Sequence, residues 1–164
     1  MYSVNFVCTG NICRSPMARM MFVNFLNERK ERAEWDVDSS ALSSWELGNG
    51  LWAPARETLK EHHIPVLKHT AKKLKKNDLE HFDLIAVMTY EHLQLVQRIF
   101  GESDNVYMYR QFRSTPSELL VDPAAPELDI SDPWYGPDSG FEETYRQLEN
   151  GLELIYNSIR LLHD

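Results

Sequence analysis

Residues 84–88 form a short, fully apolar run, LIAVM, and this run constrains the fold of the chain most strongly. A continuous apolar run of this length is typical of a strand that is buried on both faces, as the strands of parallel sheets are. Parallel strands need crossover connections, which are usually helices. The rest of the chain should therefore supply helices that cover both faces of a small sheet.

Strand and helix patterns alternate along the rest of the chain. Strand patterns cover residues 2–7, 35–38 and 106–109. Helical periodicity covers residues 15–25, 54–62 and 91–100, and a longer apolar seam begins where Ser139 and Glu142 match a capping box. This alternation predicts βαβ units with right-handed crossovers. We expect an α/β fold: a single three-layer domain over residues 1–164, with a small, about four-stranded parallel sheet flanked by helices.

The composition excludes several classes of protein. The formal net charge is −8 and the sequence pI is about 5.2, whereas nucleic-acid binders and proteins that bind anionic membranes carry excess basic residues. No apolar stretch approaches the ~18 residues that a membrane helix needs, and the start lacks the regions of a secretory signal. We expect a cytoplasmic protein with no nucleic-acid partner and no membrane partner.

The chain has two cysteines, Cys8 and Cys13, in one short segment. A disulfide there would close a very small loop and stabilise little, and two thiols are too few for a cysteine zinc site. The pair therefore indicates reactive chemistry inside a cell. Two roles stay open for Cys13, a small buried residue or a resolving thiol that forms a disulfide with an oxidised Cys8.

The strongest chemical signal follows the first predicted strand. Cys8 ends that strand, Arg14 follows after five residues, and Ser15 with Pro16 gives a helix start with Ser15 as the N-cap. Backbone amides before a helix bind anions, a guanidinium binds two phosphate oxygens, and Gly10 allows the loop to curl. Cysteines beside arginine or a helix N-terminus have pKa values of about 3.5–7.5, and their thiolates are nucleophiles. A buried thiol and a surface arginine are the plain alternative, but the placement between strand and helix predicts a phosphate-binding loop after the first strand.

If such a thiolate attacks a phosphate ester, a general acid is also needed for the leaving oxygen. Two Asp-Pro pairs are candidates, at Asp122 and Asp132. A turn explains Asp122 sufficiently. Trp134 and Tyr135 directly follow the second pair, and aromatic rings beside a carboxylate suit an aryl phosphate. The pattern favours Asp132.

The segment 7–18, VCTGNICRSPMA, resembles the phosphate loop of the low-molecular-weight protein tyrosine phosphatases over its whole length. Residues 38–48 are similar to that family's next strand and pocket wall, and residues 132–135 and 140–143 are similar to its acid loop and last helix. The resemblance spans essentially the whole chain. It implies that Cys8 is the nucleophile of a phosphocysteine mechanism, that Arg14 binds the phosphate, and that Asp132 is the acid and then the base. It implies neither a metal nor another cofactor.

The resemblance also implies supporting residues. Loop residues should surround the phosphate, and these are Thr9, Gly10, Asn11, Ile12 and Cys13. Ser15 should hydrogen-bond the thiolate, although the residue pattern alone makes it an N-cap. Asn11 is expected in an uncommon backbone conformation, braced by Ser39 and His69.

The length of phosphotyrosine predicts a deep pocket that phosphoserine and phosphothreonine cannot use. We expect Trp45, Trp134 and Tyr135 to form its walls and Ile12 its floor, while ordinary packing is the alternative for each ring, above all for Trp45. The expected substrates are phosphotyrosine proteins or their kinase, and the product is inorganic phosphate.

Phosphoarginine is the alternative substrate, because some bacterial relatives in this family cleave it. Those relatives carry a threonine at the position of Ile12, so Ile12 favours tyrosine. The dipeptide at residues 88–89, Met-Thr, occurs in some arginine phosphatases and reopens the question. Other departures are Arg19, where the family has an acidic residue, and residues 51–56, which lack its Asp-Pro-Arg.

Two other functions are less well supported. An arsenate reductase on this loop needs further cysteines, and none follows Cys13. A silent phosphotyrosine-binding module predicts loss of the nucleophile or acid, and both are present. His62 and His63 have the wrong spacing for a metal pair, and the lysines between residues 68 and 76 are most simply a solvated helix face.

Overall fold

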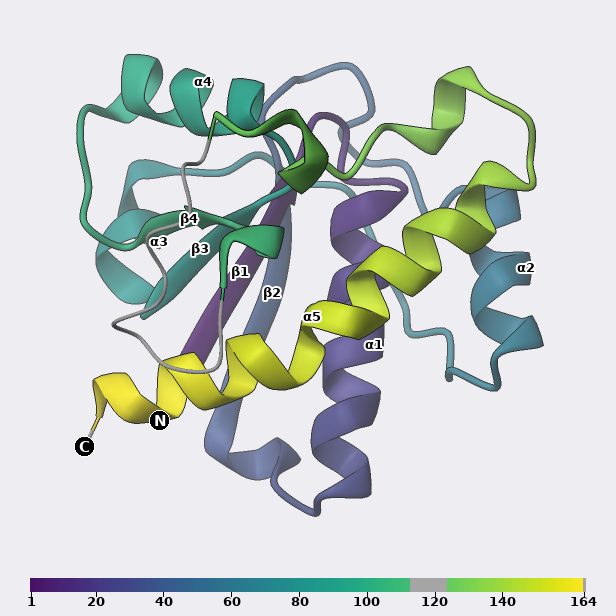
Figure 1. Ribbon diagram of the computed structural model, residues 1–164, viewed down its shortest axis with the longest axis horizontal. Helices are drawn as coiled ribbons and strands as arrows, with labels where there is room; N and C mark the ends of the chain where they lie inside the picture. The colour runs from purple at the N-terminus through teal and green to yellow at the C-terminus, as the bar shows by residue number, and fades with distance from the viewer. Residues whose placement is uncertain (113–123, 164) are drawn as a thin grey trace.

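The computed structural model describes residues 1–112 and 124–163 of the chain. Four parallel strands form one sheet in the order β2-β1-β3-β4 (Figure 1). The strands are β1 (Tyr2–Cys8), β2 (Trp35–Ala41), β3 (Leu84–Val87) and β4 (Val106–Met108). The predicted fold class, strand number and apolar central strand are confirmed.

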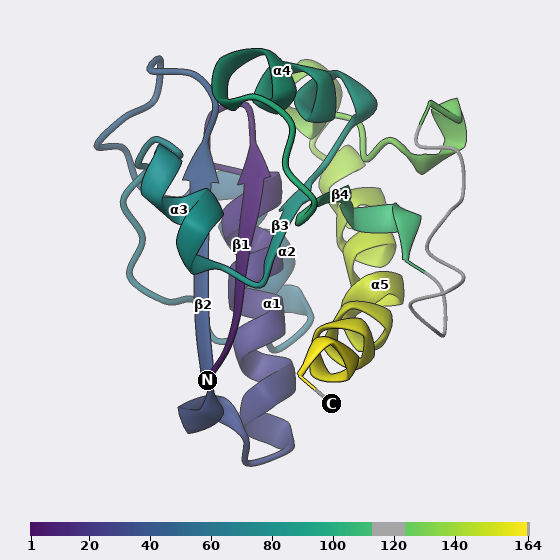
Figure 2. The ribbon, with the colours of Figure 1, turned by 90° about the vertical axis from the view of Figure 1, so that its left-hand side faces the viewer.

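Helices cover both faces of this sheet (Figure 2). They are α1 (Arg14–Glu28), α2 (Ala53–Glu61), α3 (Lys76–His81), α4 (Tyr90–Phe100) and α5 (Gly140–Leu162). Helices α1 and α5 pack on one face and on each other, with α2 outside them against α5, while α3 and α4 lie on the other face. None of these described helices is both long and apolar enough to cross a membrane.

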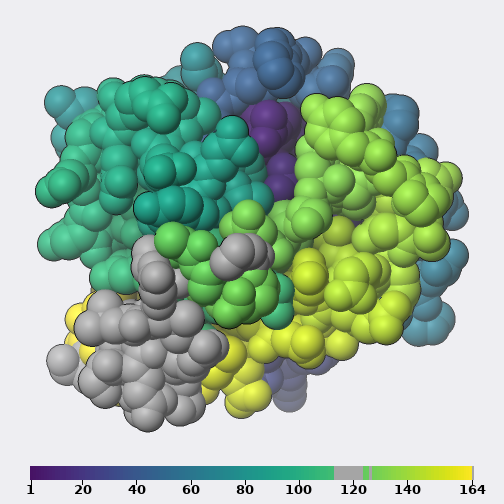
Figure 3. Space-filling model, turned by 45° about the horizontal axis from the view of Figure 1, so that its top comes forward, coloured from purple at the N-terminus to yellow at the C-terminus, as the bar shows by residue number. Residues whose placement is uncertain are grey.

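The carboxyl ends of the strands lie together at one edge of the sheet. In a parallel sheet this is the edge where ligands bind. The space-filling view shows a hollow there, with the purple N-terminal part of the chain at its floor (Figure 3). Strand β1 lies between β2 and β3. The loop that follows β1 therefore lies at the position expected for a functional site.

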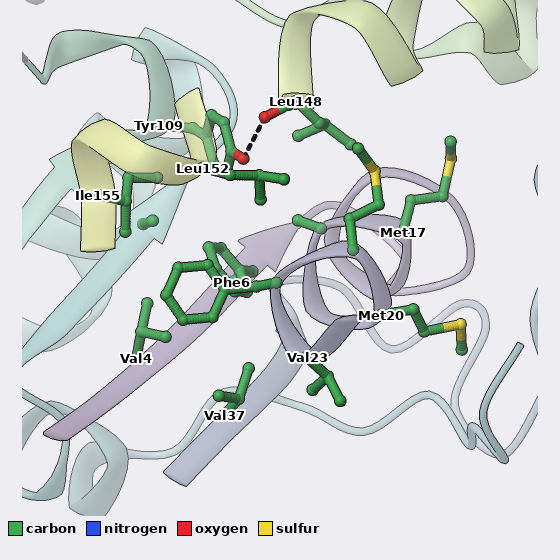
Figure 4. Packing of buried hydrophobic residues seen from close by; sticks show 14 of the residues in the cluster. Val4, Phe6, Met17, Met20, Val23, Val37, Tyr109, Leu148, Leu152 and Ile155 are labelled. Atoms are coloured by element: carbon green, nitrogen blue, oxygen red, sulfur yellow. Dashed lines mark hydrogen bonds between the residues drawn. The ribbon is translucent and has the colours of Figure 1, made fainter. Parts of the chain in front are cut away.

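The larger core cluster lies between the sheet, α1 and α5 (Figure 4). The ring of Phe6 lies 5.7 Å from that of Phe22 and 5.8 Å from that of Tyr109. Tyr109 is fully buried, and its hydroxyl donates to the Leu148 carbonyl at 2.5 Å. Gly151 faces the same ring, because a Cβ there would lie 2.6 Å from Tyr109 Cε1. The ring therefore fits closely between β1 and α5.

Two local predictions are wrong. The lysines at residues 68–75 lie in irregular chain, and only Lys76 belongs to a helix. The capping box of α5 does not form: Ser139 makes no side-chain cap, and the Glu142 carboxylate lies 2.7 Å from His62 Nε2 instead. The His62 ring also stacks on Tyr145 at 3.7 Å. A tertiary contact between α2 and α5 thus replaces the local cap.

Candidate active site

A cavity of about 120 Å³ lies at the carboxyl end of β1. Its lining comes from the loop after β1, from the loop after β2 and from the segment before α5: Cys8, Thr9, Gly10, Ile12, Cys13, Arg14, Ser43, Trp45, Glu46, Asp132, Trp134 and Tyr135. The structure therefore brings together the predicted nucleophile, arginine, acid and aromatic walls. Ser43 and Glu46 are lining residues that the sequence patterns did not indicate.

The Cys8 sulfur has two polar neighbours, a backbone N–H and a serine hydroxyl. The Asn11 backbone N–H donates to this sulfur at 3.3 Å, and the Ser15 hydroxyl lies 3.0 Å from it. Cys8 is buried and forms no disulfide. A backbone N–H and a hydroxyl thus both lie within hydrogen-bonding distance of this sulfur.

Asn11 holds the loop in a left-handed turn, with φ of +60°. For a residue other than glycine this conformation costs roughly 1–2 kcal/mol, and hydrogen bonds on every side of Asn11 offset it. Its Nδ2 donates to Ser15 Oγ at 2.8 Å and to Ser39 Oγ at 3.0 Å. Its Oδ1 accepts from the Lys72 backbone at 3.1 Å, and its carbonyl accepts from His69 Nε2 at 2.6 Å. The loop conformation is thus fixed by segments distant in sequence.

His69 donates to this loop as a neutral imidazole. Burial lowers its pKa, and the nearby charges of Arg19 and Lys72 lower it further. The hydrogen bond to Asn11 opposes this but is the smaller effect. Arg19, which departs from the family pattern, is therefore one of the positive charges near His69.

Arg14 lines the cavity and is almost fully buried. One terminal nitrogen donates to the Ile130 carbonyl at 2.8 Å. The other lies 3.5 Å from Asp132 Oδ2 and 3.5 Å from Thr9 Oγ1. Its Nε is buried and has no hydrogen-bond partner within the described part of the chain. The guanidinium is therefore fixed in place by its terminal nitrogens, while its Nε–H remains available to a ligand.

Asp132 reaches the cavity from a short 3-10 turn, η5 (Pro133–Tyr135), for which it is the N-cap. Its Oδ1 accepts from the Trp134 backbone N–H at 3.0 Å, and its side chain remains 26% exposed. The preceding chain is tied to the sheet, because Ile130 N–H donates to the Met88 carbonyl at 2.9 Å. The other candidate, Asp122, lies outside the described residues.

Comparisons with known proteins agree with this geometry. The family model for "low molecular weight phosphotyrosine protein phosphatase" matches residues 3–161. The chain belongs to this family of phosphatases. The human low molecular weight phosphotyrosine protein phosphatase is 38% identical over 147 residues, which are 88% of this chain and 87% of that protein. The predicted family and the predicted enzyme class are confirmed.

Solved structures of related proteins have the same fold. YfkJ from Bacillus subtilis superposes with a TM-score of 0.85 at 28% identity, over 100% of this chain and 98% of that one. The YwlE arginine phosphatase, with a phosphorylated active-site serine, superposes with a TM-score of 0.76 at 28% identity, over 93% and 92% of the two chains. YwlE is also a Bacillus subtilis protein.

In this phosphatase the predicted N-cap role of Ser15 is wrong. Helix α1 begins at Arg14 with Cys13 as its N-cap, and no side chain caps it. The Ser15 hydroxyl is instead used by Cys8 and Asn11. At Gly10 a Cβ would be tight, at 3.3 Å from Glu46 Cγ, but Gly10 has no left-handed backbone. Asn11, rather than Gly10, has the left-handed backbone of the loop.

The phosphatase also has a buried histidine that the sequence patterns did not indicate. His92 Nε2 lies 2.9 Å from Thr9 Oγ1, on the side of Thr9 that faces α4. Burial, and then the Arg14 charge, lowers the pKa of His92 to about 3. The imidazole is therefore neutral near pH 7. Because Arg14 only donates, the Thr9 hydroxyl accepts from Arg14, and the tautomer of His92 decides which of Thr9 and His92 donates to the other.

The second cysteine of the phosphatase, Cys13, is held in its protonated form. Burial, and then the neighbouring Cys8, raises the pKa of Cys13 far above its usual range. Cys13 is thus a neutral thiol in the cavity lining. Within the described residues, no group of three or more His, Cys, Asp or Glu side chains is placed to hold a metal ion.

Proposed function

We propose that this chain is a single phosphatase domain, residues 1–164, that hydrolyses phosphotyrosine in proteins through a phosphocysteine intermediate. One observation carries the proposal: the Cys8 sulfur, with two hydrogen-bonding neighbours, opens into the same cavity as Arg14 and Asp132. A nucleophile, a phosphate ligand and an acid are the groups that this reaction needs.

The proposed reaction has two displacements. The Cys8 thiolate attacks phosphorus, while the free Arg14 Nε and the loop amides bind the equatorial oxygens. Asp132 gives its proton to the leaving tyrosine oxygen, and its carboxylate then takes a proton from the water that breaks the S–P bond. Inorganic phosphate leaves, and Cys8 is again a thiolate. The positive charge comes from Arg14 and the amides, so we expect a metal chelator to leave turnover unchanged.

A covalent intermediate has a parallel among the relatives. A mutant of the related YwlE arginine phosphatase, in which serine replaces a cysteine, is known with a phosphorylated serine in its active site. Phosphoserine is more stable to hydrolysis than S-phosphocysteine, which would account for its isolation. By analogy we place the phosphate of the intermediate on Cys8.

Phosphotyrosine is the substrate that the cavity favours. Three aromatic rings and the Ile12 side chain line it, and these surfaces suit a phenyl ring. The human relative supports the same substrate by its description, and YwlE supports phosphoarginine. The substrates would then be phosphotyrosine proteins or their kinase. The cytoplasmic location stays a prediction.

The two substrates can be compared directly. A peptide of one sequence would carry phosphotyrosine or phosphoarginine at the same position, and kcat/KM would be measured for both at neutral pH. We expect at least about a tenfold preference for phosphotyrosine. A preference for phosphoarginine would reverse the substrate assignment while leaving the nucleophile in place.

The nucleophile is tested separately. Cys8→Ser should lower turnover of an aryl phosphate by more than about 10³-fold and still bind inorganic phosphate in a calorimetric titration. Cys13→Ser is the matched control, because it changes a thiol of the same cavity that the mechanism does not use as nucleophile. Equal losses in the two variants would contradict the assignment.

A further inference from the structure

Trp52 contacts both parts of the active site without lining the cavity. Its backbone N–H donates to the Ile12 carbonyl of the phosphate loop at 3.0 Å. Its ring centroid lies 4.4 Å from that of Trp134, with the planes at 43°. Trp52 is therefore tied to the phosphate loop by its backbone and to the acid loop by its side chain.

The contact with Trp134 reaches the acid directly. The backbone N–H of Trp134 donates to Asp132 Oδ1 at 3.0 Å, so a shift of the Trp134 backbone shifts the carboxylate. The Trp52 backbone is fixed, because Trp52 is the N-cap of α2 and Pro54 follows in the first turn of that helix. Trp134 belongs only to a short 3-10 turn, so its backbone is held less firmly, while the two rings are similarly exposed, at 40% and 41%.

Other contacts hold the chain before the acid and one oxygen of the acid itself, since Arg14 lies 3.5 Å from Asp132 Oδ2, but they do not reach Trp134. The Arg14 guanidinium and the Met88 carbonyl hold Ile130, before the acid. Beyond the acid, Tyr135 is 81% exposed. Trp52 is the one aromatic ring that contacts Trp134 within the described residues. The position of the Trp134 ring thus depends on the Trp52 side chain.

We propose that Trp52 is a positioning residue for the general acid: its ring holds Trp134, and through it the Asp132 carboxylate, at the height of the leaving oxygen. This inference rests on the proposed function, in which Asp132 is the acid. Trp52 touches neither the substrate nor the reacting atoms, because it does not line the cavity. Its effect should therefore be on proton delivery and not on phosphate binding.

The test uses a series of aryl phosphates with leaving groups of different basicity. The quantity measured is kcat/KM, which covers the steps up to phosphorylation of Cys8. Trp52→Ala should lower kcat/KM about tenfold for phenyl phosphate and by less than about twofold for an activated aryl phosphate, because only a basic leaving group needs the proton. The inhibition constant of inorganic phosphate should not change. Trp52→Phe should restore most of the loss.

Three controls make the outcome decisive. Ile99→Ala removes an exposed apolar side chain on α4 and should change nothing. In an Asp132→Ala background, Trp52→Ala should add less than about a twofold loss, because the acid it positions is gone. Should Trp52→Ala not fold, Trp52→Leu takes its place, since it keeps an apolar side chain without a ring.

The possible failures are distinguishable. If Asp132→Ala itself showed no dependence on the leaving group, the acid role in the proposed function would fail. If Asp132→Ala showed that dependence and Trp52→Ala lowered all substrates equally or none, the inference about Trp52 alone would be overturned. A full tenfold loss on top of Asp132→Ala would also overturn it. A second readout needs no substrate: exciton-coupled circular dichroism of the tryptophan pair should vanish in Trp52→Ala and Trp134→Ala alike.

Discussion

The Ser15 hydroxyl oxygen lies 3.0 Å from the Cys8 sulfur and, on its other side, 2.8 Å from Asn11 Nδ2. Because an amide nitrogen only donates, Ser15 Oγ accepts from Asn11. The serine proton then has two acceptors, the sulfur at 3.0 Å and the Ser40 carbonyl at 3.5 Å. The nearer one is the sulfur, so in the proposed mechanism Ser15 donates to the Cys8 thiolate.

Ser15→Ala should lower kcat by about 10- to 100-fold, because a hydrogen bond to a charged group contributes about 1.5–3 kcal/mol. Affinity for inorganic phosphate should change little. Turnover and phosphate inhibition of purified protein give both quantities. Ser158→Ala, at another buried serine, is the control and should keep wild-type turnover. Unchanged kcat in Ser15→Ala would exclude the hydroxyl as a donor to the sulfur.

Peroxide should inactivate the enzyme reversibly if Cys13 is a resolving thiol. The Cys8 thiolate would take an oxygen from peroxide to give a sulfenic acid, and Cys13 would displace water from it to form a disulfide. The raised pKa of Cys13 makes this closure slow, because the thiolate is the attacking form. The measurement is the activity recovered with a thiol reductant, which should be high in the wild type and low in Cys13→Ser. Equal recovery in both would leave Cys13 a packing residue.

Acid should destabilise the wild type more steeply than a variant without His92. The folded pKa of His92 is lowered to about 3, while an unfolded histidine titrates near 6.5. Between these values the unfolded chain binds a proton that the folded chain does not, so stability falls as pH falls below about 6.5, by about 1.4 kcal/mol per pH unit. From pH 6.5 to 5 the wild type should lose about 2 kcal/mol more than His92→Gln in urea unfolding. Parallel losses would show that His92 is protonated in the folded enzyme.

Gly151→Ala should destabilise the fold. Alanine gains about 1 kcal/mol in a helix over glycine, but the new Cβ would lie 2.6 Å from Tyr109 Cε1. Tyr109 cannot move aside, because it is fully buried and its hydroxyl is bonded to Leu148. Overpacking costs about 1–3 kcal/mol, so we expect a net loss of about 1–2 kcal/mol in denaturant unfolding. Gly136→Ala, where a Cβ meets nothing within 4 Å, should be neutral.

Local patterns predicted the sheet and the phosphate loop because both depend on neighbouring residues. The run at residues 84–88 is typical of a strand buried on both faces, and Cys8 and Arg14 are close in sequence. Patterns failed where a distant residue competes for a side chain. Ser15 and Glu142 match local caps, yet Cys8 and His62 take their polar groups. Sequence patterns also missed His92 and Trp52, because the partner of each, Thr9 or Trp134, is far away in the sequence.

In the proposed mechanism, the phosphate-binding residues and the general acid come from separate segments of the chain. Cys8 to Arg14 is one uninterrupted stretch, whereas Asp132 arrives on a segment placed from outside by Trp52, Arg14 and Met88. An exchange of residues 131–137 between family members could therefore transplant leaving-group preference without altering how tightly the anion is held. Natural selection could change substrate preference in the same way, by altering this surface loop while the phosphate-binding loop stays unchanged.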